Sequence, residues 1–137
     1  MPAVTDLQYQ ALIKQATAGD ITETSPVRGR LGEAATVNAA NFKASKAKVF
    51  SYEFANLNTT TWRFVQLYNK ATAPSPPSDV GVLVLKIAIP PGGVRTQTFI
   101  RGLDFNAGLG IAVTGAVADT DATAIGANEV VGSIYYQ

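Results

Sequence analysis

Short apolar runs separated by turn residues begin at Lys48 and continue to the end of the 137-residue chain. Such a series of short strands at regular spacing is typical of a β-sandwich or barrel, and helical periodicity is absent from this part. The sequence therefore predicts an all-β fold, an antiparallel, jelly-roll-like β-sandwich over residues 48–137. The seven expected strands are residues 48–55, 61–69, 82–89, 94–101, 103–105, 109–115 and 129–136.

The clearest strand is residues 48–55, because aromatic and polar side chains alternate along it. Phe50, Tyr52 and Phe54 share one parity, so we expect an aromatic row that faces the core. Residues 61–69 are the next strand along the chain, and we expect the two strands to pair as a hairpin.

Residues 82–89 are apolar on both parities except at Lys86. Two interpretations fit this pattern. Either the strand is central and covered on both sides, or its outer face contacts another subunit. The small size of the chain favours the second interpretation, which makes Val82 and Val84 candidate interface residues.

Proline and glycine mark the connections between these strands. Residues 70–79 hold three prolines, which predicts a surface loop because proline lacks a ladder donor. Residues 90–93 force a reversal into the strand 94–101, where Arg95 is expected to point outward. Residues 116–128 are small and polar, which fits either a free loop or a short turn of helix.

The first 47 residues differ from the rest, since only two of the chain's aromatic residues, Tyr9 and Phe42, precede position 49. We expect an extended N-terminal arm over residues 1–47, removable through residue 44 without unfolding the sandwich. Within it, residues 5–17 have the spacing of one short helix, with Thr5 or Asp6 as its cap. A helix of this length is marginal in water and would form only when packed on something.

Two interpretations of the arm remain open. Termini are commonly disordered, but some become ordered against a partner subunit. Apolar residues are spaced singly along the arm, as if each entered a separate pocket, and this favours the partner interpretation. These residues are Ile21, Val27, Leu31, Val37 and Phe42. We take Ile21, Val27, Leu31 and Phe42, together with Val82 and Val84, as candidate interface residues.

The absence of histidine and cysteine narrows the functional classes. It removes the commonest general base, the commonest metal ligand, disulfides and thiolate chemistry. A net charge of +1 is too small for a phosphate-tracking surface. No apolar run is long enough for a membrane span, and no signal peptide is recognisable. We expect a soluble, non-enzymatic protein with no cofactor, no metal, no nucleic-acid partner and no membrane partner.

Several weaker signals have ordinary explanations beside functional ones. Asp119 and Asp121 resemble the start of a calcium loop, but most of that pattern is missing, so a solvated turn is favoured. Asn58 begins a glycosylation motif that is frequent by chance. The aromatic residues Trp62 and Tyr135, like Tyr136, could stack on a sugar but fit a core or an interface better. The basic residues before position 49, among them Lys43, Lys46 and Lys48, fit a solvated face better than an acidic protein partner or nucleic acid.

A family resemblance runs through residues 50–137. The sequence contains, in order, the runs VQLYNKATAP (65–74), IAIPPGG (87–93), GLDF (102–105), GLGIAVTG (108–115), ADTD (118–121) and YY (135–136). This series resembles small virion proteins of tailed bacteriophages. The resemblance implies a β-sandwich attached to the particle, acting as a structural part without enzymatic activity. Residues 1–48 do not carry the match.

Together these observations predict a capsid decoration or cement protein in the virion, assembled in the host cytoplasm. Its expected partners are the major capsid protein or other virion proteins, and we expect it to form a homo-oligomer, a trimer. The alternative is a tail, neck or host-recognition fibre module that binds a cell-surface glycan through Trp62 or Tyr135. A third hypothesis is a carbohydrate-acting enzyme that pairs Asp104 with Asp119 or Asp121, although the spacing does not demand it.

Overall fold

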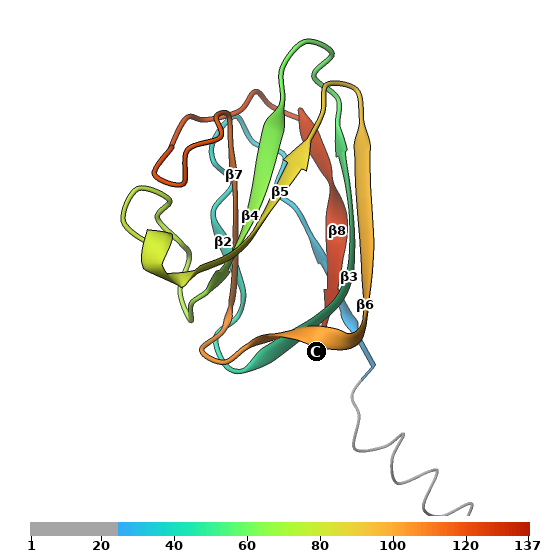
Figure 1. Cartoon of the computed structure of the whole chain (residues 1–137), viewed down its shortest axis with the longest axis vertical. Coiled ribbons are helices and arrows are strands. Elements are labelled where there is room, and N and C mark those ends of the chain that lie inside the picture. Colours follow the sequence, from blue (N-terminus) through green and yellow to red (C-terminus); the bar gives the residue numbers. More distant parts are fainter. Residues whose placement is uncertain (1–24) are drawn as a thin grey trace, which may run out of the picture.

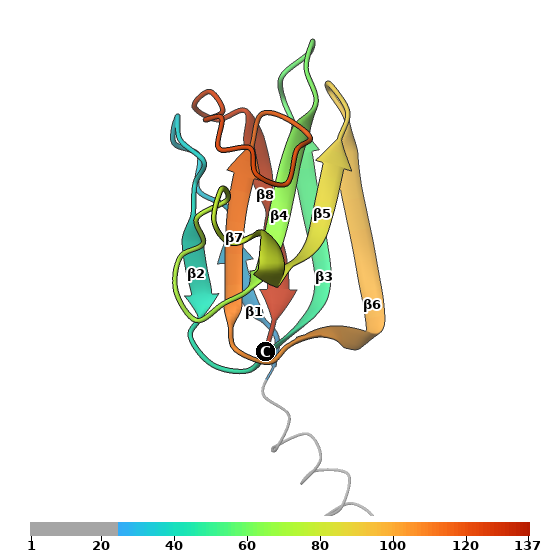
Figure 2. The same ribbon diagram turned by 60° about the vertical axis from the view of Figure 1, so that its left-hand side comes forward.

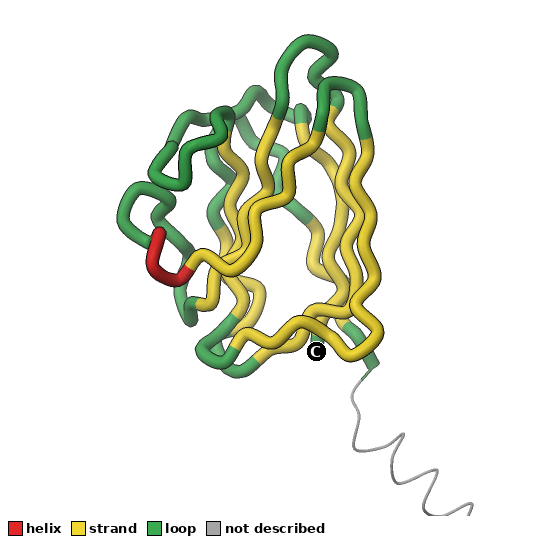
Figure 3. The backbone as a smooth tube through the Cα atoms, in the orientation of Figure 1, coloured by secondary structure: helices red, strands yellow, loops and turns green. Residues whose placement is uncertain are grey.

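The computed structural model describes residues 25–137 of the chain. These residues form eight β-strands, which pair into two antiparallel sheets (Figure 1). Sheet 1 has the strand order β1-β8-β3-β6 and sheet 2 the order β2-β7-β4-β5. Loops and one 3-10 turn, η1, complete the described chain (Figure 3). The elements are β1 (Val27–Arg30), β2 (Ala40–Lys43), β3 (Ala47–Asn56), β4 (Arg63–Asn69), η1 (Val80–Val82), β5 (Leu83–Ile89), β6 (Val94–Phe105), β7 (Leu109–Thr114) and β8 (Val130–Tyr136).

The strands pair as nested partners along the chain. β1 pairs with β8, β2 with β7, β3 with β6, and β4 with β5. The pairing of β3 with β8 then completes sheet 1, and the pairing of β4 with β7 completes sheet 2. One long hairpin folded over on itself has this order, which is the order of a jelly roll. The predicted antiparallel, jelly-roll-like sandwich is therefore confirmed.

The core lies between the two sheets and is built from alternate residues of facing strands. Strand alternation sends every second side chain inward, so each sheet supplies one apolar layer. The main buried members are Leu31, Val49, Phe54, Val65, Leu67, Ile87, Ile89, Phe105, Leu109, Ile111, Val113, Ile125, Val130 and Ile134. No helix among the described residues is long and apolar enough to cross a membrane.

The expected boundary between arm and sandwich at residue 48 is wrong, because β1 and β2 are strands of the sandwich. Leu31, at the end of β1, is only 2% exposed and belongs to the core. Strands of four residues are too short to show a clear alternation, which is why this segment resembled an arm. The predicted helix at residues 5–17 and the candidate Ile21 lie outside the described residues.

The predicted hairpin between the first two aromatic strands is also wrong, because β3 and β4 belong to different sheets. Both strands bury apolar side chains in the same core, so they face each other across it and do not share a ladder. The loop between them crosses from one sheet to the other. Asn56, at the end of β3, fixes this crossing by donating from Nδ2 to the carbonyl oxygens of Thr61 (2.9 Å) and Ile89 (3.1 Å).

A β-bulge at Phe50 changes the parity of β3. Val49 pairs with Leu103 of β6, whereas Ser51 pairs with Thr98, so both ladders shift at Phe50. One extra residue moves every following side chain to the other face. As a result Val49 and Phe54 both point into the core, and Phe50 is not part of the buried cluster. The expected inward row therefore holds for Tyr52 and Phe54 only.

β6 runs through two of the seven predicted strands, and β1 and β2 are strands that the sequence did not predict, so the described residues hold eight strands. Its ladder with β3 is interrupted at residues 99–102, where Ile100 is 95% exposed. Arg95 does not point outward as expected. It lies opposite the core residue Phe54 in the ladder with β3. Its Nε donates to the carbonyl oxygen of Ala88 on β5 at 3.1 Å, and this hydrogen bond links sheet 1 to sheet 2.

Candidate interaction surfaces

Four exposed valines lie on or beside the edge strand β5 and are here called the valine patch: Val84 on the strand, Val80 and Val82 in η1 just before it, and Val117 in the loop after β7. Within the described chain β5 pairs only with β4, so its other edge is free and the interpretation of a central strand is wrong. Its inner parity is buried at Ile87 and Ile89, whereas Val84 on the outer parity is 42% exposed. Lys86 holds the loop with Val117 beside β5 by contacting the Val117 carbonyl oxygen and the Asp119 carboxylate.

The structure separates the predicted interface residues into buried and exposed groups. Leu31 is in the core, and Phe42 packs against it while stacking on Tyr136 with ring centroids 5.9 Å apart. The Tyr136 hydroxyl also donates to the Phe42 carbonyl oxygen at 3.0 Å. The expectation that Leu31 and Phe42 enter pockets on a partner is therefore wrong.

The other predicted interface residues in the described chain are exposed. Val27 on β1 is 52% exposed, and Val82 and Val84 belong to the valine patch. β1 and β5 lie in different sheets, so the fold does not join Val27 to the patch in one ladder. Their role in an interface stays a prediction.

The outer face of sheet 2 is covered by two loops, residues 70–82 and 115–125 (Figure 2). Beneath them Tyr68 and Gln66 of β4 are fully buried although they point away from the core. The Tyr68 hydroxyl donates to Gln66 Oε1, and Gln66 Nε2 donates to Thr114 Oγ1 at 2.9 Å. Burial, helped by the charges of Asp79 and Asp119, raises the pKa of Tyr68 to about 12. This polar chain is structural, because loops close it off from solvent.

The outer face of sheet 1 has no such cover from the described residues, and we call it the open face (Figure 1). Its side chains form rows across the sheet, because Tyr135 lies opposite Arg28 and Ser51, and Glu53 lies opposite Ser133 and Thr96. Two shallow hollows, of about 200 and 220 Å³, lie on this face. The available sequence signal for this surface is the alternation along residues 48–55, because Ser51 and Glu53 have the opposite parity to Tyr52 and Phe54.

The carboxylates considered for metal binding or catalysis already serve the fold. Asp121 accepts hydrogen bonds from the amides of Ala116 and Thr123, each at 3.1 Å, and from Thr123 Oγ1 at 2.6 Å. Asp119 forms an ion pair with Lys86 on sheet 2. On sheet 1, Oδ1 of Asp104 lies 3.7 Å from Nζ of Lys48. Among residues 25–137 no three metal-ligating side chains come together. The fold does not pair Asp104 with either of the other two.

The glycosylation motif is also engaged in the fold. Asn58 Oδ1 accepts from the amides of Thr60 and Thr61, each at 2.9 Å. Its Nδ2, the atom that a glycan would occupy, donates to Glu129 Oε1 at 3.0 Å. Attachment of a sugar at Asn58 would replace one of the two Nδ2 hydrogens and crowd this contact between the β3–β4 loop and the residue before β8.

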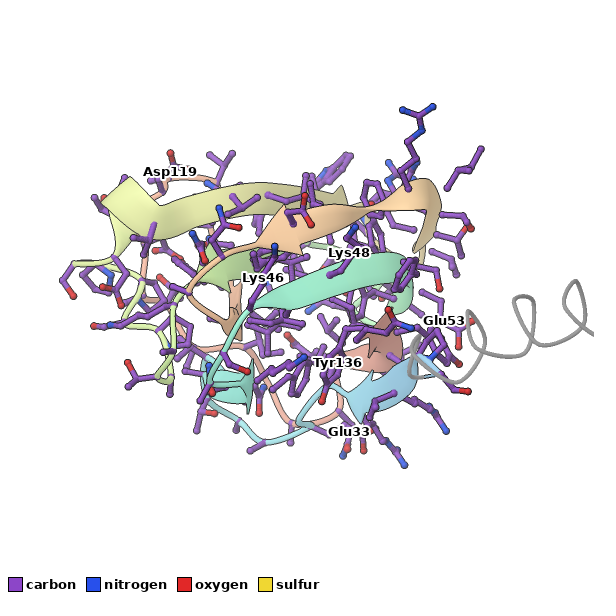
Figure 4. All side chains as sticks on the ribbon, turned by 90° about the horizontal axis from the view of Figure 1, so that it is seen from below. Glu33, Lys46, Lys48, Glu53, Asp119 and Tyr136 are labelled. Carbon is purple, nitrogen blue, oxygen red and sulfur yellow. The ribbon has the colours of Figure 1, made fainter. Side chains whose placement is uncertain are left out.

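The aromatic and basic candidates are dispersed over the fold. Trp62 is 47% exposed on the β3–β4 loop, whereas Tyr135 lines a hollow of the open face. Figure 4 shows Lys46 and Lys48 at the entry to β3, with Glu53 further along that strand. Lys48 is partly neutralised by Asp104, so this end of the sandwich is not a continuous basic surface.

Comparisons with known proteins give the chain no family name. No family model matches it, and no curated protein matches it by sequence. Among solved structures, the chain is similar to the coat protein of Tobacco streak virus, with 9% sequence identity over 82% of this chain and 84% of that chain. The TM-score is 0.36, and a likeness of this degree carries no inference about function.

Proposed function

We propose that this chain is a non-enzymatic bacteriophage virion structural protein, a capsid decoration or cement protein that bridges shell subunits. The observation that carries the proposal is the valine patch beside the free edge of β5. Four exposed valines on or beside a strand that has one free edge favour contact with another polypeptide. The resemblance of residues 50–137 to phage virion proteins supports a virus particle as the assembly in which that polypeptide would lie.

The proposed mechanism is burial of apolar surface across the joint between shell subunits. Each square ångström of apolar area removed from water contributes about 25 cal/mol, so an interface of ordinary size supplies several kcal/mol after the costs of association. These contacts must break before the shell can open, and many identical copies add their effects. The partners would be the major capsid protein or other virion proteins, with the decoration protein itself a homotrimer.

Co-sedimentation with purified capsids tests this proposal. Val84→Glu places a charge in the valine patch and should lower capsid affinity about tenfold or more. In the contact with the capsid, the apolar valine would no longer be buried and a carboxylate would have to be desolvated. Val94→Glu is the matched control, since Val94 is also an exposed valine, at 57% against 42% for Val84, but lies on β6, an edge strand of sheet 1. Equal binding by both variants and the unchanged chain would reject the valine patch as the contact.

A second candidate is a tail, neck or host-recognition module that binds a cell-surface glycan. The observation that favours it is the open face, where Tyr135 lines a hollow next to hydroxyl and carboxylate side chains. The jelly-roll fold does not choose between the two candidates, because it occurs in both viral capsid and lectin domains. Capsid binding without saccharide binding would favour decoration, and saccharide binding without capsid binding would favour recognition.

A further inference from the structure

The open face of sheet 1 offers polar side chains to which no other side chain of residues 25–137 is bonded. Within residues 25–137 no ion pair involves Glu53, and no side-chain hydrogen bond uses the hydroxyls of Ser51, Thr96 or Thr98. By contrast, Asn58, Asp119 and Asp121 are all engaged in holding loops. Free polar groups that converge on one hollow are the feature expected of a ligand site.

The shape of the open face follows from small side chains in the middle of the sheet. Ser51 lies between Tyr135 and Thr98, and Glu53 lies between Ser133 and Thr96. Because the side chains of Ser51, Thr96 and Thr98 are short, they leave a hollow of about 200 Å³, whose lining also includes Tyr52, Glu53, Gln97 and Tyr135. The volume is below the roughly 300–1,000 Å³ of sites for drug-sized ligands, so the hollow suits a single small ring.

A second hollow continues the first along the strands, because both are lined by Glu53. It measures about 220 Å³ and adds the apolar side chains of Val94 and Val131, with Arg28 at its side. Arg28 Nε is bonded to Ser133 Oγ at 2.8 Å, which fixes the guanidinium over this part of the face. Two adjoining hollows that share a carboxylate would hold a ligand of at least two units.

The lining chemistry selects among ligand classes. A phosphate or nucleotide is disfavoured in the first hollow because the only charged side chain there is the anionic Glu53. A purely hydrophobic ligand is disfavoured because it would leave the aliphatic hydroxyls of Ser51, Thr96 and Thr98 without hydrogen-bond partners. One carboxylate alone does not hold a cation. A sugar ring has hydroxyls around its rim that can bond to Glu53 and to the hydroxyls of the lining, and an apolar face that can pack on the Tyr135 ring.

We propose that the open face binds an oligosaccharide of two or more rings, with Glu53 accepting hydrogen bonds from hydroxyls of both rings and Tyr135 packing on one of them. This site goes beyond the decoration function and supplies the residues for the recognition function. It lies on the outside of sheet 1, whereas the valine patch lies on the outside of sheet 2. A module held to a particle by the patch would thus leave the open face turned to solvent.

The test is binding of the full chain to an array of neutral and acidic oligosaccharides, followed by titration of the bound ones in solution. Glu53→Gln and Tyr135→Ala should each lower affinity about tenfold, the loss expected for one good polar or stacking contact. Trp62→Ala is the control, because Trp62 is an exposed aromatic outside both hollows, and it should leave affinity unchanged.

The outcomes separate this site from the decoration function. Glu53 is exposed, so Glu53→Gln should fold normally by circular dichroism even if Tyr135→Ala does not. The same Glu53→Gln chain should still co-sediment with capsids if the valine patch makes that contact. Absence of binding to every oligosaccharide on the array would overturn the proposal. Equal binding by Glu53→Gln and the unchanged chain, or loss of binding in Trp62→Ala alone, would overturn it as well.

Discussion

Arg63 Nε lies 2.7 Å from Oε2 of Glu129, and this ion pair joins the start of β4 in sheet 2 to the residue before β8 in sheet 1. Both side chains are largely buried, at 14% and 22% exposed. Glu129 Oε1 accepts a second hydrogen bond from Asn58 Nδ2 at 3.0 Å. One carboxylate therefore holds the β3–β4 loop, β4 and the entry to β8 together at one end of the sandwich.

Replacement of this carboxylate should destabilise the fold. We expect Glu129→Gln to lower the free energy of unfolding by about 1–3 kcal/mol, because the partly buried Arg63 loses its charged partner. Chemical denaturation measures the change. Glu33→Gln is the matched control, since Glu33 pairs with the exposed Arg30 and such surface pairs contribute about 0–1 kcal/mol. Equal losses in the two variants would contradict a special role for the Glu129 pair.

The same carboxylate predicts an acid limit to stability. The hydrogen bonds from Arg63 and Asn58 lower the pKa of Glu129 from 4.5 to about 2. Because the folded pKa is the lower one, the stabilisation is complete above pH 4.5 and is lost as the pH falls toward 2. Thermal unfolding between pH 2 and pH 6 should show this loss, and Glu129→Gln should flatten it. A wild-type melting temperature that is constant over this interval would refute the assignment.

Gly132 should tolerate no side chain. Its φ is +147°, and a Cβ atom there would overlap the carbonyl oxygen of Glu53 on the paired strand β3. Since the obstacle is backbone in the centre of sheet 1, we expect Gly132→Ala to cost about 3 kcal/mol or more, or to prevent folding. Gly81→Ala is the control, because a Cβ at Gly81 meets nothing within 4 Å. Soluble yield and melting temperature would separate the two variants.

Truncation from the N-terminus should have a sharp limit. A chain that begins at residue 25 keeps all eight strands and should give the circular dichroism spectrum of a folded sandwich. A chain that begins at residue 45 loses β1, β2 and the buried Leu31, and we expect it to unfold or aggregate because two strands become new, uncovered edges. This reverses the sequence-based expectation that residues 1–44 can be removed. Cooperative unfolding of the shorter chain would contradict the structure.

Strand positions were predictable from residue 48 onward because alternation and turn residues are local signals. The runs at β3, β4, β5, β7 and β8 were all recognised near their observed bounds. β1 and β2 were missed since four residues cannot display a period, and their apolar members were assigned to a partner. For the candidate surfaces, the exposed Val82 and Val84 followed from excess hydrophobicity on β5, whereas the open face depends on which strands lie side by side.

The sequence by itself determined that this chain folds as an antiparallel β-sandwich and that the outer parity of β5 is too apolar for an ordinary solvated strand. Both follow from the order of apolar and polar residues over a few positions. Only the tertiary structure decided which strands pair, that Leu31 fills the core, and that Glu53 and Tyr135 meet at one hollow. These are contacts between residues far apart in the chain, and the bulge at Phe50 that sets their parity leaves no periodic trace in the sequence.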